Sequence, residues 1–188
     1  MVRNILIVVD MLNDFINEDG ALYCGPTASA IVPAVEKIVK EFREREDPLI
    51  FLMDAHKEDD IEFKRFPKHC VKDTEGAKII SSLIKNPSRR EFYIEKTRYS
   101  GFYGTNLETI LANIKTIFGM MAKDVIDTVE VVGVCTSICV MDTVGGLANR
   151  DYKIRVHKNC VADFDQEMHK MALSRMELLY GAEVVEGK

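Results

Sequence analysis

Short apolar runs alternate along this chain with longer segments in which apolar residues recur every three or four positions. The short runs are typical of buried β-strands, and the longer segments are typical of amphipathic helices. The expected strands are 4–9, 49–53, 91–95, 129–134, 153–156 and 182–185. The expected helices are 29–46, 75–84, 105–121, 137–149 and 165–180. Short apolar strands joined by helices predict an α/β fold with three layers, α/β/α, around a six-stranded, mostly parallel, doubly wound sheet of Rossmann-like type.

Two irregularities stand out in this pattern. The polar loop 54–74 is the longest stretch without a regular period, and long loops of this kind often carry function. Gly145 and Gly146 lie inside the expected helix 137–149, where glycine lowers helix stability. The glycine pair therefore indicates close packing of this helix against a neighbouring element.

Composition narrows the class of protein. The chain has 188 residues, of which 47% are hydrophobic, so we expect one domain spanning 1–188. A formal net charge of −5 gives no basic face for nucleic acid, and no apolar run reaches the roughly 18 residues that a membrane span needs. The five cysteines lack disulfide or zinc-knuckle spacing, and we expect no leader before the first core strand. These features predict a reduced, cytoplasmic protein that binds neither nucleic acid nor membrane.

An acid, a cation and a thiol are expected just past the ends of three strands. Asp10 follows the first strand, Lys96 the third and Cys139 the fourth. In an open α/β sheet the ligand crevice lies outside the carboxyl ends of the strands, so these side chains are predicted to converge on one substrate. The combination is typical of a cysteine hydrolase that has no catalytic histidine.

Each of these three residues also has a plainer explanation. A thiol at the start of a helix is expected to have a lowered pKa, which favours Cys139 over Cys135 as the nucleophile, but both could be buried apolar side chains. Asp10 is either a general base whose pKa is raised by burial or a cap for the next turn. Lys96 is either a cation that stabilises a thiolate and an oxyanion or a surface lysine.

The long loop carries side chains that bind transition metals. Asp54, His56 and His69 can bind a divalent ion and leave positions open for water or substrate, and Glu62 is a weaker fourth candidate. The alternative is a polar loop with solvated histidines, and the sequence favours neither explanation. Zn, Fe and Mn all tolerate such a ligand set, with Zn expected first. The other two histidines, at 157 and 169, are expected to be structural or to lie on the surface.

Ordered motifs along nearly the whole chain resemble those of isochorismatase-like cysteine hydrolases, and more narrowly those of the nicotinamidases. The first block is Val-Val-Asp-Met-Leu-Asn-Asp-Phe at 8–15. The second combines Asp-Ala-His at 54–56 with Phe-Pro-Lys-His-Cys-Val at 66–71 and Thr-Glu-Gly-Ala at 74–77. The other three are Glu-Lys-Thr-Arg-Tyr-Ser-Gly-Phe at 95–102, Gly-Val-Cys-Thr-Ser-Ile-Cys-Val at 133–140 and Cys-Val-Ala-Asp at 160–163. Five ordered blocks at compatible spacing make this resemblance specific.

The resemblance implies a role for each candidate. Asp10, Lys96 and Cys139 would form the catalytic triad, and the backbone N–H groups of Cys135 and Cys139 the oxyanion hole, beside a cis peptide between Val134 and Cys135. The Asp54, His56 and His69 set, with Glu62 in some members, marks the metal-dependent nicotinamidases. The implied reaction is hydrolysis of nicotinamide to nicotinate and ammonia through a cysteine thioester, in NAD salvage. A small amide is then the expected partner, and the family also makes a homo-oligomer plausible.

Two positions depart from the pattern of many relatives. Phe66 stands where many have Trp, and Ser137 stands where many have Asp. The candidates to wall a flat aromatic substrate are Phe15, Phe66, Tyr103 and Val134. Packing in the core explains the presence of each of them equally well.

Two rival functions remain on the sequence alone. The nearer one is another amidohydrolase of the same family, acting on a carbamoyl, ureido or other small amide. The farther one is a non-catalytic nucleotide-binding module, which is disfavoured because residues 10–14 replace the glycine-rich turn that such a module needs after its first strand.

Overall fold

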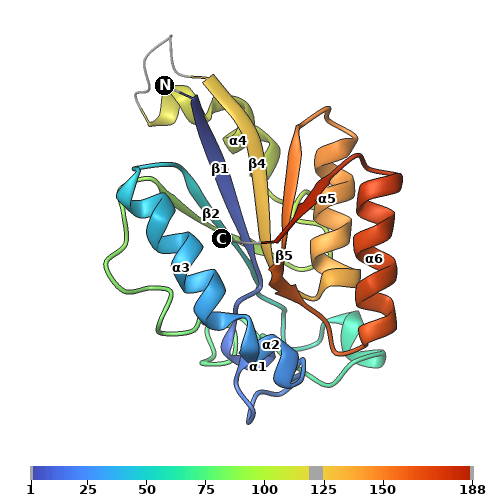
Figure 1. Ribbon diagram of the computed structural model, residues 1–188. Coiled ribbons are helices and arrows are strands. Elements are labelled where there is room, and N and C mark those ends of the chain that lie inside the picture. Colours follow the sequence, from blue (N-terminus) through green and yellow to red (C-terminus); the bar gives the residue numbers. More distant parts are fainter. Residues whose placement is uncertain (1, 119–124, 187–188) are drawn as a thin grey trace.

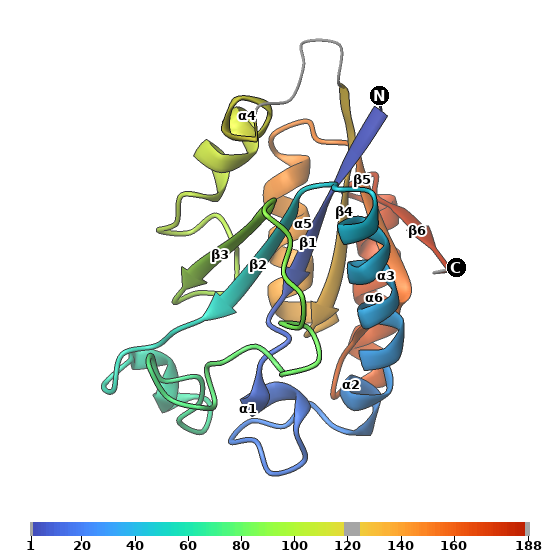
Figure 2. The ribbon, with the colours of Figure 1, turned by 90° about the vertical axis from the view of Figure 1, so that its left-hand side faces the viewer.

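All six strands lie in one parallel sheet, in the order β3-β2-β1-β4-β5-β6. The computed structural model describes residues 2–118 and 125–186. The strands are β1 (Val2–Val9), β2 (Leu49–Asp54), β3 (Glu91–Lys96), β4 (Val125–Val134), β5 (Ile154–Ala162) and β6 (Glu183–Val185). Because the chain winds outward from β1 to one edge and then from β4 to the other, the predicted doubly wound sheet is confirmed (Figure 2).

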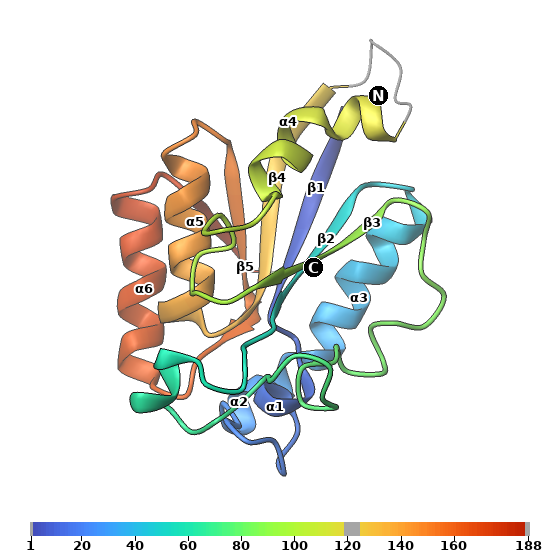
Figure 3. The same ribbon diagram turned by 180° about the vertical axis from the view of Figure 1, so that it is seen from behind.

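Helices cover both faces of this sheet (Figures 1 and 3). They are α1 (Asn13–Ile16), α2 (Pro26–Ala30), α3 (Val32–Glu44), α4 (Leu107–Ile117), α5 (Met141–Ala148) and α6 (Gln166–Leu178). A short 3₁₀ turn, η1 (Ile61–Lys64), lies in the long loop, and a π-helical turn, η2 (Thr136–Val140), precedes α5. The predicted three-layer architecture is therefore confirmed.

The alternating side chains of β1 supply both halves of the core. Leu6 and Val8 pack on the face covered by α3, whereas Ile5, Ile7 and Val9 pack on the face covered by α4, α5 and α6. Since both faces of the strand are buried, its sequence is continuously apolar. The central position of β1 then places the residue that follows it, Asp10, in the middle of the carboxyl edge.

The expected helix 29–46 is divided in two. The chain ends α2 at Ala30 and begins α3 at Val32, with Pro33 in the first turn of α3. Proline has no backbone N–H to donate and therefore suits the start of a helix better than its interior. The rest of the prediction holds, because α3 buries Val35, Ile38, Val39 and Phe42.

The expected helix 75–84 is wrong. Within this segment the backbone makes only turn bonds, from Lys78 N–H to Glu75 O and from Leu83 N–H to Ile80 O. Others of its backbone groups bond to α1, since Asn13 N–H donates to Lys78 O and Asp14 N–H donates to Gly76 O. Arg43 of α3 also donates to Leu83 O. The segment instead runs in turns along α1 and α3, where its apolar side chains still reach the core.

Other element boundaries shift without changing the order. β5 continues to Ala162, well beyond the expected 153–156, and β4 begins at Val125. The expected helix 105–121 is observed as Leu107–Ile117, and residues 119–121 of that expectation lie outside the described residues. The expected helix 137–149 is observed as η2 followed by α5.

The close packing predicted at Gly145 and Gly146 is confirmed. A Cβ at Gly146 would lie 2.4 Å from Cδ2 of Phe102, and one at Gly145 would lie 3.0 Å from Cζ of Tyr180. These glycines allow α5 to meet both rings at close range. Within 2–118 and 125–186, no helix has the length and apolar character needed to cross a membrane.

Candidate active site

Asp10 is held by the strand that it follows and by the strand beside it. Its φ of 50° turns the chain sharply away from β1. Its backbone N–H donates to Leu52 O at 3.0 Å, and its Oδ1 accepts from Asp54 N–H at 2.9 Å. On the other side of β1, a Cβ at Gly133 would lie 1.9 Å from Val9 O, so only glycine lets β4 pass this close. The Asp10 carboxylate is therefore fixed and fully buried at the centre of the edge.

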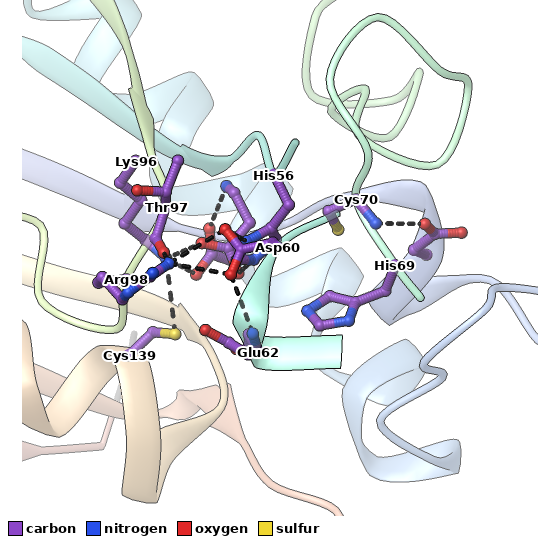
Figure 4. A network of polar contacts seen from close by, with 12 residues as sticks. His56, Asp60, Glu62, His69, Cys70, Lys96, Thr97, Arg98 and Cys139 are labelled. Atoms are coloured by element: carbon purple, nitrogen blue, oxygen red, sulfur yellow. Dashed lines mark hydrogen bonds and ion pairs between the residues drawn. The ribbon is translucent and has the colours of Figure 1, made fainter. Parts of the chain in front are cut away.

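Lys96 links the acid to the thiol (Figure 4). Its Nζ lies 2.7 Å from Asp10 Oδ2 and 2.5 Å from Asp54 Oδ1, and donates to Cys139 Sγ at 3.5 Å. Lys96 pairs in register with Asp54, so β2 carries the carboxylate that shares the ammonium with Asp10. The structure thus brings together the three residues expected to converge, although β3 and β4 lie on opposite sides of β1.

Burial and charge set the protonation of these groups. Burial and then repulsion from Asp54 raise the pKa of Asp10 to about 7, although the ammonium of Lys96 opposes this. Burial disfavours the charged form of Lys96, but Asp10 and Asp54 outweigh it and raise the pKa of the lysine well above its ordinary value. Lys96 is therefore a permanent cation.

The pKa of the Cys139 thiol corrects a sequence-based expectation. Burial raises the pKa of Cys139 well above its ordinary value, with Lys96 opposing and Asp10 and Asp54 adding to the rise. The direction is therefore opposite to the expected lowering, chiefly because the thiol is buried. A raised pKa disfavours the thiolate, so a base is needed to take the proton of Cys139.

Cys135 and Cys139 are separated clearly by their neighbours. Cys135 Sγ lies 3.1 Å from Cys24 Sγ, whereas Cys139 Sγ accepts from Lys96. The peptide between Val134 and Cys135 is cis, as the family resemblance implies. Only Cys139 of the two has the cation beside its sulfur, so the structure favours it as the nucleophile. All five cysteines are free thiols and buried.

Asp54, His56 and His69 form a buried cluster beside this group. One ligand atom from each lies within 4.8 Å of the others. Asp54 Oδ2 is 3.6 Å from His56 Nε2, while the Nδ1 atoms of His56 and His69 contact Asp60 Oδ2 and Pro67 O. The fourth candidate, Glu62, is also buried.

The cluster fits a divalent metal ion. His56 Nε2 and Glu62 Oε2 are buried atoms without a hydrogen-bond partner in the described part of the chain. Buried polar atoms are almost always satisfied, so two unpaired acceptors facing one carboxylate and a second histidine are what a metal site requires. Burial raises the pKa of Glu62, and His56 opposes that rise.

Backbone pairing explains why residues 13 positions apart meet here. His56 N–H donates to Cys70 O and His56 O accepts from Lys72 N–H, a short bridge that draws His69 beside His56. Asp14 Oδ2 accepts the Cys70 N–H at 2.7 Å and so ties the same turn to α1. The long loop is thus ordered around the cluster.

A cavity of about 320 Å³ is lined by Asp10 and Cys139 and by three of the metal-ligand candidates, Asp54, Glu62 and His69. Phe15, Phe66 and Val134 line it, as expected for a substrate wall. Tyr103 does not: its side chain is 64% exposed, so its assignment as a wall is corrected. Tyr99 lines the cavity instead, because the turn after β3 points that ring inward.

Three supporting acids were missed as site residues. Asp163 Oδ2 accepts the Ser137 N–H at 2.7 Å and so holds the turn that carries Cys139. Asp14 and Asp60 hold the metal-ligand loop. Asp14 and Asp163 lie in the family-like motifs given above, and this could have identified them as site residues. Asp60 lies in none of these motifs.

The two remaining histidines are structural, as expected. His157 contacts Glu130 through Nε2, and His169 Nδ1 lies 2.9 Å from Thr136 Oγ1, which joins α6 to the turn that carries Cys139.

Known proteins of similar sequence and structure identify the family of this chain. A family model described as the isochorismatase domain matches residues 4–188. The crystal structure of the nicotinamidase/pyrazinamidase PncA from Bacillus subtilis is similar at a TM-score of 0.87 and 35% identity, covering 98% of this chain and 100% of that one. N-carbamoylsarcosine amidase from Thermoplasma acidophilum is similar at 0.81 and 33%, covering 99% and 97%. The pyrazinamidase of Pyrococcus horikoshii in complex with zinc is similar at 0.82 and 28%, covering 98% and 99%. The chain therefore belongs to the isochorismatase family.

Proposed function

We propose that this protein is a metal-dependent nicotinamidase, which hydrolyses nicotinamide to nicotinate and ammonia through a cysteine thioester. One observation carries the proposal. The buried Asp10, Lys96 and Cys139 side chains adjoin the Asp54, His56 and His69 cluster, and a single aromatic-lined cavity opens onto both. A hydrolase for a small aromatic amide needs a nucleophile, a base and a means of holding the ring, and this cavity offers all three.

The first half of the reaction forms the thioester. Asp10 takes the proton of the Cys139 thiol, and the thiolate attacks the carboxamide carbon. The backbone N–H groups of Cys135 and Cys139 hold the oxyanion, and Asp10 returns the proton to the departing nitrogen, which leaves as ammonia. Lys96 stabilises the negative charge as it moves between Asp10 and Cys139.

The second half regenerates the thiol. Asp10 takes a proton from water, the hydroxide attacks the thioester carbon, and the carbon–sulfur bond breaks to release nicotinic acid, which loses its own proton to solvent or ammonia and becomes nicotinate. The sulfur regains its proton from Asp10. Each proton that Asp10 accepts is thus returned within the same half of the cycle.

Asp54, His56 and His69 would hold the metal ion, with Glu62 as a further ligand. When bound, the ion supplies a Lewis-acid position for the ring nitrogen or for water. Zinc is the first metal to test, because the similar Pyrococcus horikoshii pyrazinamidase binds it, and the donor set also suits Fe and Mn. Phe15, Phe66, Tyr99 and Val134 then wall the substrate ring by packing.

The test is ammonia release from nicotinamide and from benzamide, which lacks the ring nitrogen, by the protein as isolated, after chelation and after zinc is restored. We expect chelator-sensitive release from nicotinamide and little from benzamide. Cys139→Ala should abolish release and keep the fold, whereas Cys160→Ala, at a buried cysteine outside the cavity lining, should retain it. Equal release from both amides, or near-full activity of Cys139→Ala, would rule out the proposal.

A second candidate is hydrolysis of a carbamoyl or ureido amide, which the similarity to N-carbamoylsarcosine amidase supports. The apolar cavity walls and the metal-ligand cluster favour nicotinamide over this candidate. Release of ammonia from N-carbamoylsarcosine, with none from nicotinamide in the zinc-loaded protein, would reverse the preference. A role in NAD salvage, a cytoplasmic location and a homo-oligomer stay predictions that follow from the proposed reaction and from the family.

A further inference from the structure

Asp60 lies beside the metal-ligand cluster, and its two carboxylate oxygens have three partners (Figure 4). Oδ2 lies 3.1 Å from His56 Nδ1, and Oδ1 accepts the Glu62 N–H at 2.9 Å. Arg98 Nη1 donates to both oxygens at 3.1 Å. The Asp60 side chain is only 7% exposed, whereas that of Arg98 is 35% exposed, so the carboxylate is shielded from water on the side of His56 and Glu62.

The contact with His56 decides which ring nitrogen can bind metal. An ionised carboxylate only accepts hydrogen bonds, so it requires a proton on Nδ1 and leaves the lone pair on Nε2. Nε2 is the buried, unpaired atom that lies 3.6 Å from Asp54 Oδ2. His69 is fixed in the same sense by a backbone oxygen, that of Pro67, at 2.7 Å from its Nδ1.

The contact with Glu62 positions a second candidate ligand. Asp60 is the N-cap of η1, and its side chain accepts the N–H of the second residue of that turn, which is Glu62. An N-cap fixes where a helical turn begins. The direction in which Glu62 enters the cluster therefore depends on the same carboxylate that orients His56.

Arg98 already supplies a positive charge to Asp60. Its Nη1 donates to both carboxylate oxygens at 3.1 Å, so the guanidinium competes with a metal ion for this carboxylate. Arg98 follows Lys96 by two residues, which connects the metal-ligand loop with the strand that carries the catalytic cation.

We propose that Asp60 is a positioning residue for the metal site, which fixes the Nδ1–H tautomer of His56 and the entry of Glu62 without binding the ion. The inference rests on the proposed metal site. Groups that hold the second nitrogen of a metal-binding histidine contribute roughly 10- to 100-fold in metal affinity. Among residues 2–118 and 125–186, Asp60 is the partner of His56 Nδ1, whereas Pro67 O is the partner of His69 Nδ1.

The experiment compares zinc affinity, by competition with a chromophoric chelator, in the wild type, Asp60→Asn and Asp59→Asn. An asparagine offers one acceptor oxygen where the aspartate offers two, so one of the contacts to His56 and Glu62 is lost. We expect zinc to bind Asp60→Asn roughly 10- to 100-fold more weakly. Asp59→Asn, an exposed neighbour in the same loop, should bind as the wild type does.

A second readout follows the tautomer directly. In the metal-free wild type, nitrogen NMR should show His56 with its proton on Nδ1, and in Asp60→Asn a mixture of both tautomers. If Asp60→Asn does not fold, Arg98→Gln, which removes the support of Asp60 only, should still weaken zinc binding several-fold. Failure of the wild type to bind zinc would overturn the proposed metal site. A wild type that binds zinc together with an Asp60→Asn variant of equal affinity would overturn the role of Asp60 alone.

Discussion

Asp163 is a fully buried carboxylate that touches the catalytic turn without lining the cavity. It accepts the Ser137 N–H at 2.7 Å and the Asp165 N–H at 3.2 Å. A buried charge is retained only where it is well satisfied, and here both donors are backbone groups. The first of them belongs to the turn that places Cys139 and its N–H. Asp163 therefore acts on the reaction through the position of that turn.

Asp163→Ala is expected to lower kcat roughly 10- to 100-fold, because small displacements of a nucleophile have effects of that size. KM should change little, since Asp163 does not line the cavity. The matched control is Asp165→Ala, which removes the N-cap of α6 two residues away and should cost about 1 kcal/mol of stability but leave kcat intact. Steady-state kinetics and urea denaturation of both variants give the comparison. Equal loss of stability with unchanged kcat in both would show that Asp163 is only structural.

The site residues that sequence predicted share one property. Asp10, Lys96 and Cys139 were predicted to follow strand ends, and parallel topology brings such positions to one edge. Asp163 also follows a strand end directly, but it was missed because β5 was expected to end at 156 and continues to Ala162. Asp60 could not be found in this way, because it lies in the loop and one of its partners is a backbone N–H group, which almost every residue has. The sequence equally gave no means of choosing Tyr99 over Tyr103, since the turn after β3 decides which ring points inward.

Among the elements, β3 is joined to α3 by a buried ion pair at the edge of the sheet. Arg43 Nε lies 2.8 Å from Glu91 Oε1 and its Nη2 lies 3.2 Å from Oε2. Ser88 N–H and the Tyr93 hydroxyl donate to the same carboxylate. Arg43 also donates to Leu83 O and so holds the segment that was expected to be a helix. Glu91 therefore organises the edge strand together with the loop that precedes it.

Glu91→Gln is expected to lower the free energy of unfolding at pH 7 by roughly 1–3 kcal/mol, the size of hydrogen bonds to a charged group. Burial favours the neutral acid, but Arg43 and the other donors outweigh it and lower the pKa of Glu91 below its ordinary value of 4.5. A lowered pKa gives stability that is present above pH 4.5 and is lost as the pH falls through the lower, folded-state value. The difference in free energy of unfolding between the wild type and Glu91→Gln should therefore become smaller in acid.

Denaturant titrations at several pH values below 7 measure this gap. Glu95→Gln, on the same strand but about half exposed and paired only with Lys72, serves as the control and should show little difference at any pH. A gap for Glu91→Gln that stays constant into acid would mean that the charge of Glu91 contributes nothing.

The segment 75–84 shows why an element can be mispredicted while the fold is not. Its apolar residues Ile79, Ile80 and Leu83 recur at a spacing compatible with a helix, and all three are buried as a helix would bury them. However, Ile80 N–H donates to Met11 O, Leu83 O accepts from Arg43, and α1 takes the carbonyl groups of Gly76 and Lys78. Hydrophobic spacing predicts which residues enter the core, but it does not reveal competing partners for the backbone. The strands were predicted correctly because parallel pairing uses the apolar runs themselves.

At the scale of the whole molecule, the metal-ligand cluster ties the long loop to the centre of the sheet. Asp54 is the last residue of β2, whereas His69 reaches the cluster from the far part of the loop. The residues after His69 hold it there, because Cys70 N–H donates to Asp14 and Val71 forms the bridge to His56. A site that uses both Asp54 and His69 exists only in the folded chain, so the ion would bind only to the folded protein. Its binding free energy is then added to the free energy of unfolding of the entire protein.

Zinc should therefore raise the thermal stability of the chelated protein. A ligand at about 100 times its Kd adds about 2.7 kcal/mol, which for a chain of this length corresponds to a rise in Tm of roughly 5–10 °C. His69→Ala should lose this rise, because the contact between loop and sheet is broken. His169→Ala, whose ring bonds Thr136 away from the cluster, should keep it, so scanning calorimetry of the three proteins with and without zinc isolates the contribution of the cluster. If zinc raised the Tm of His69→Ala as much as that of the wild type, zinc would be stabilising the protein from another site.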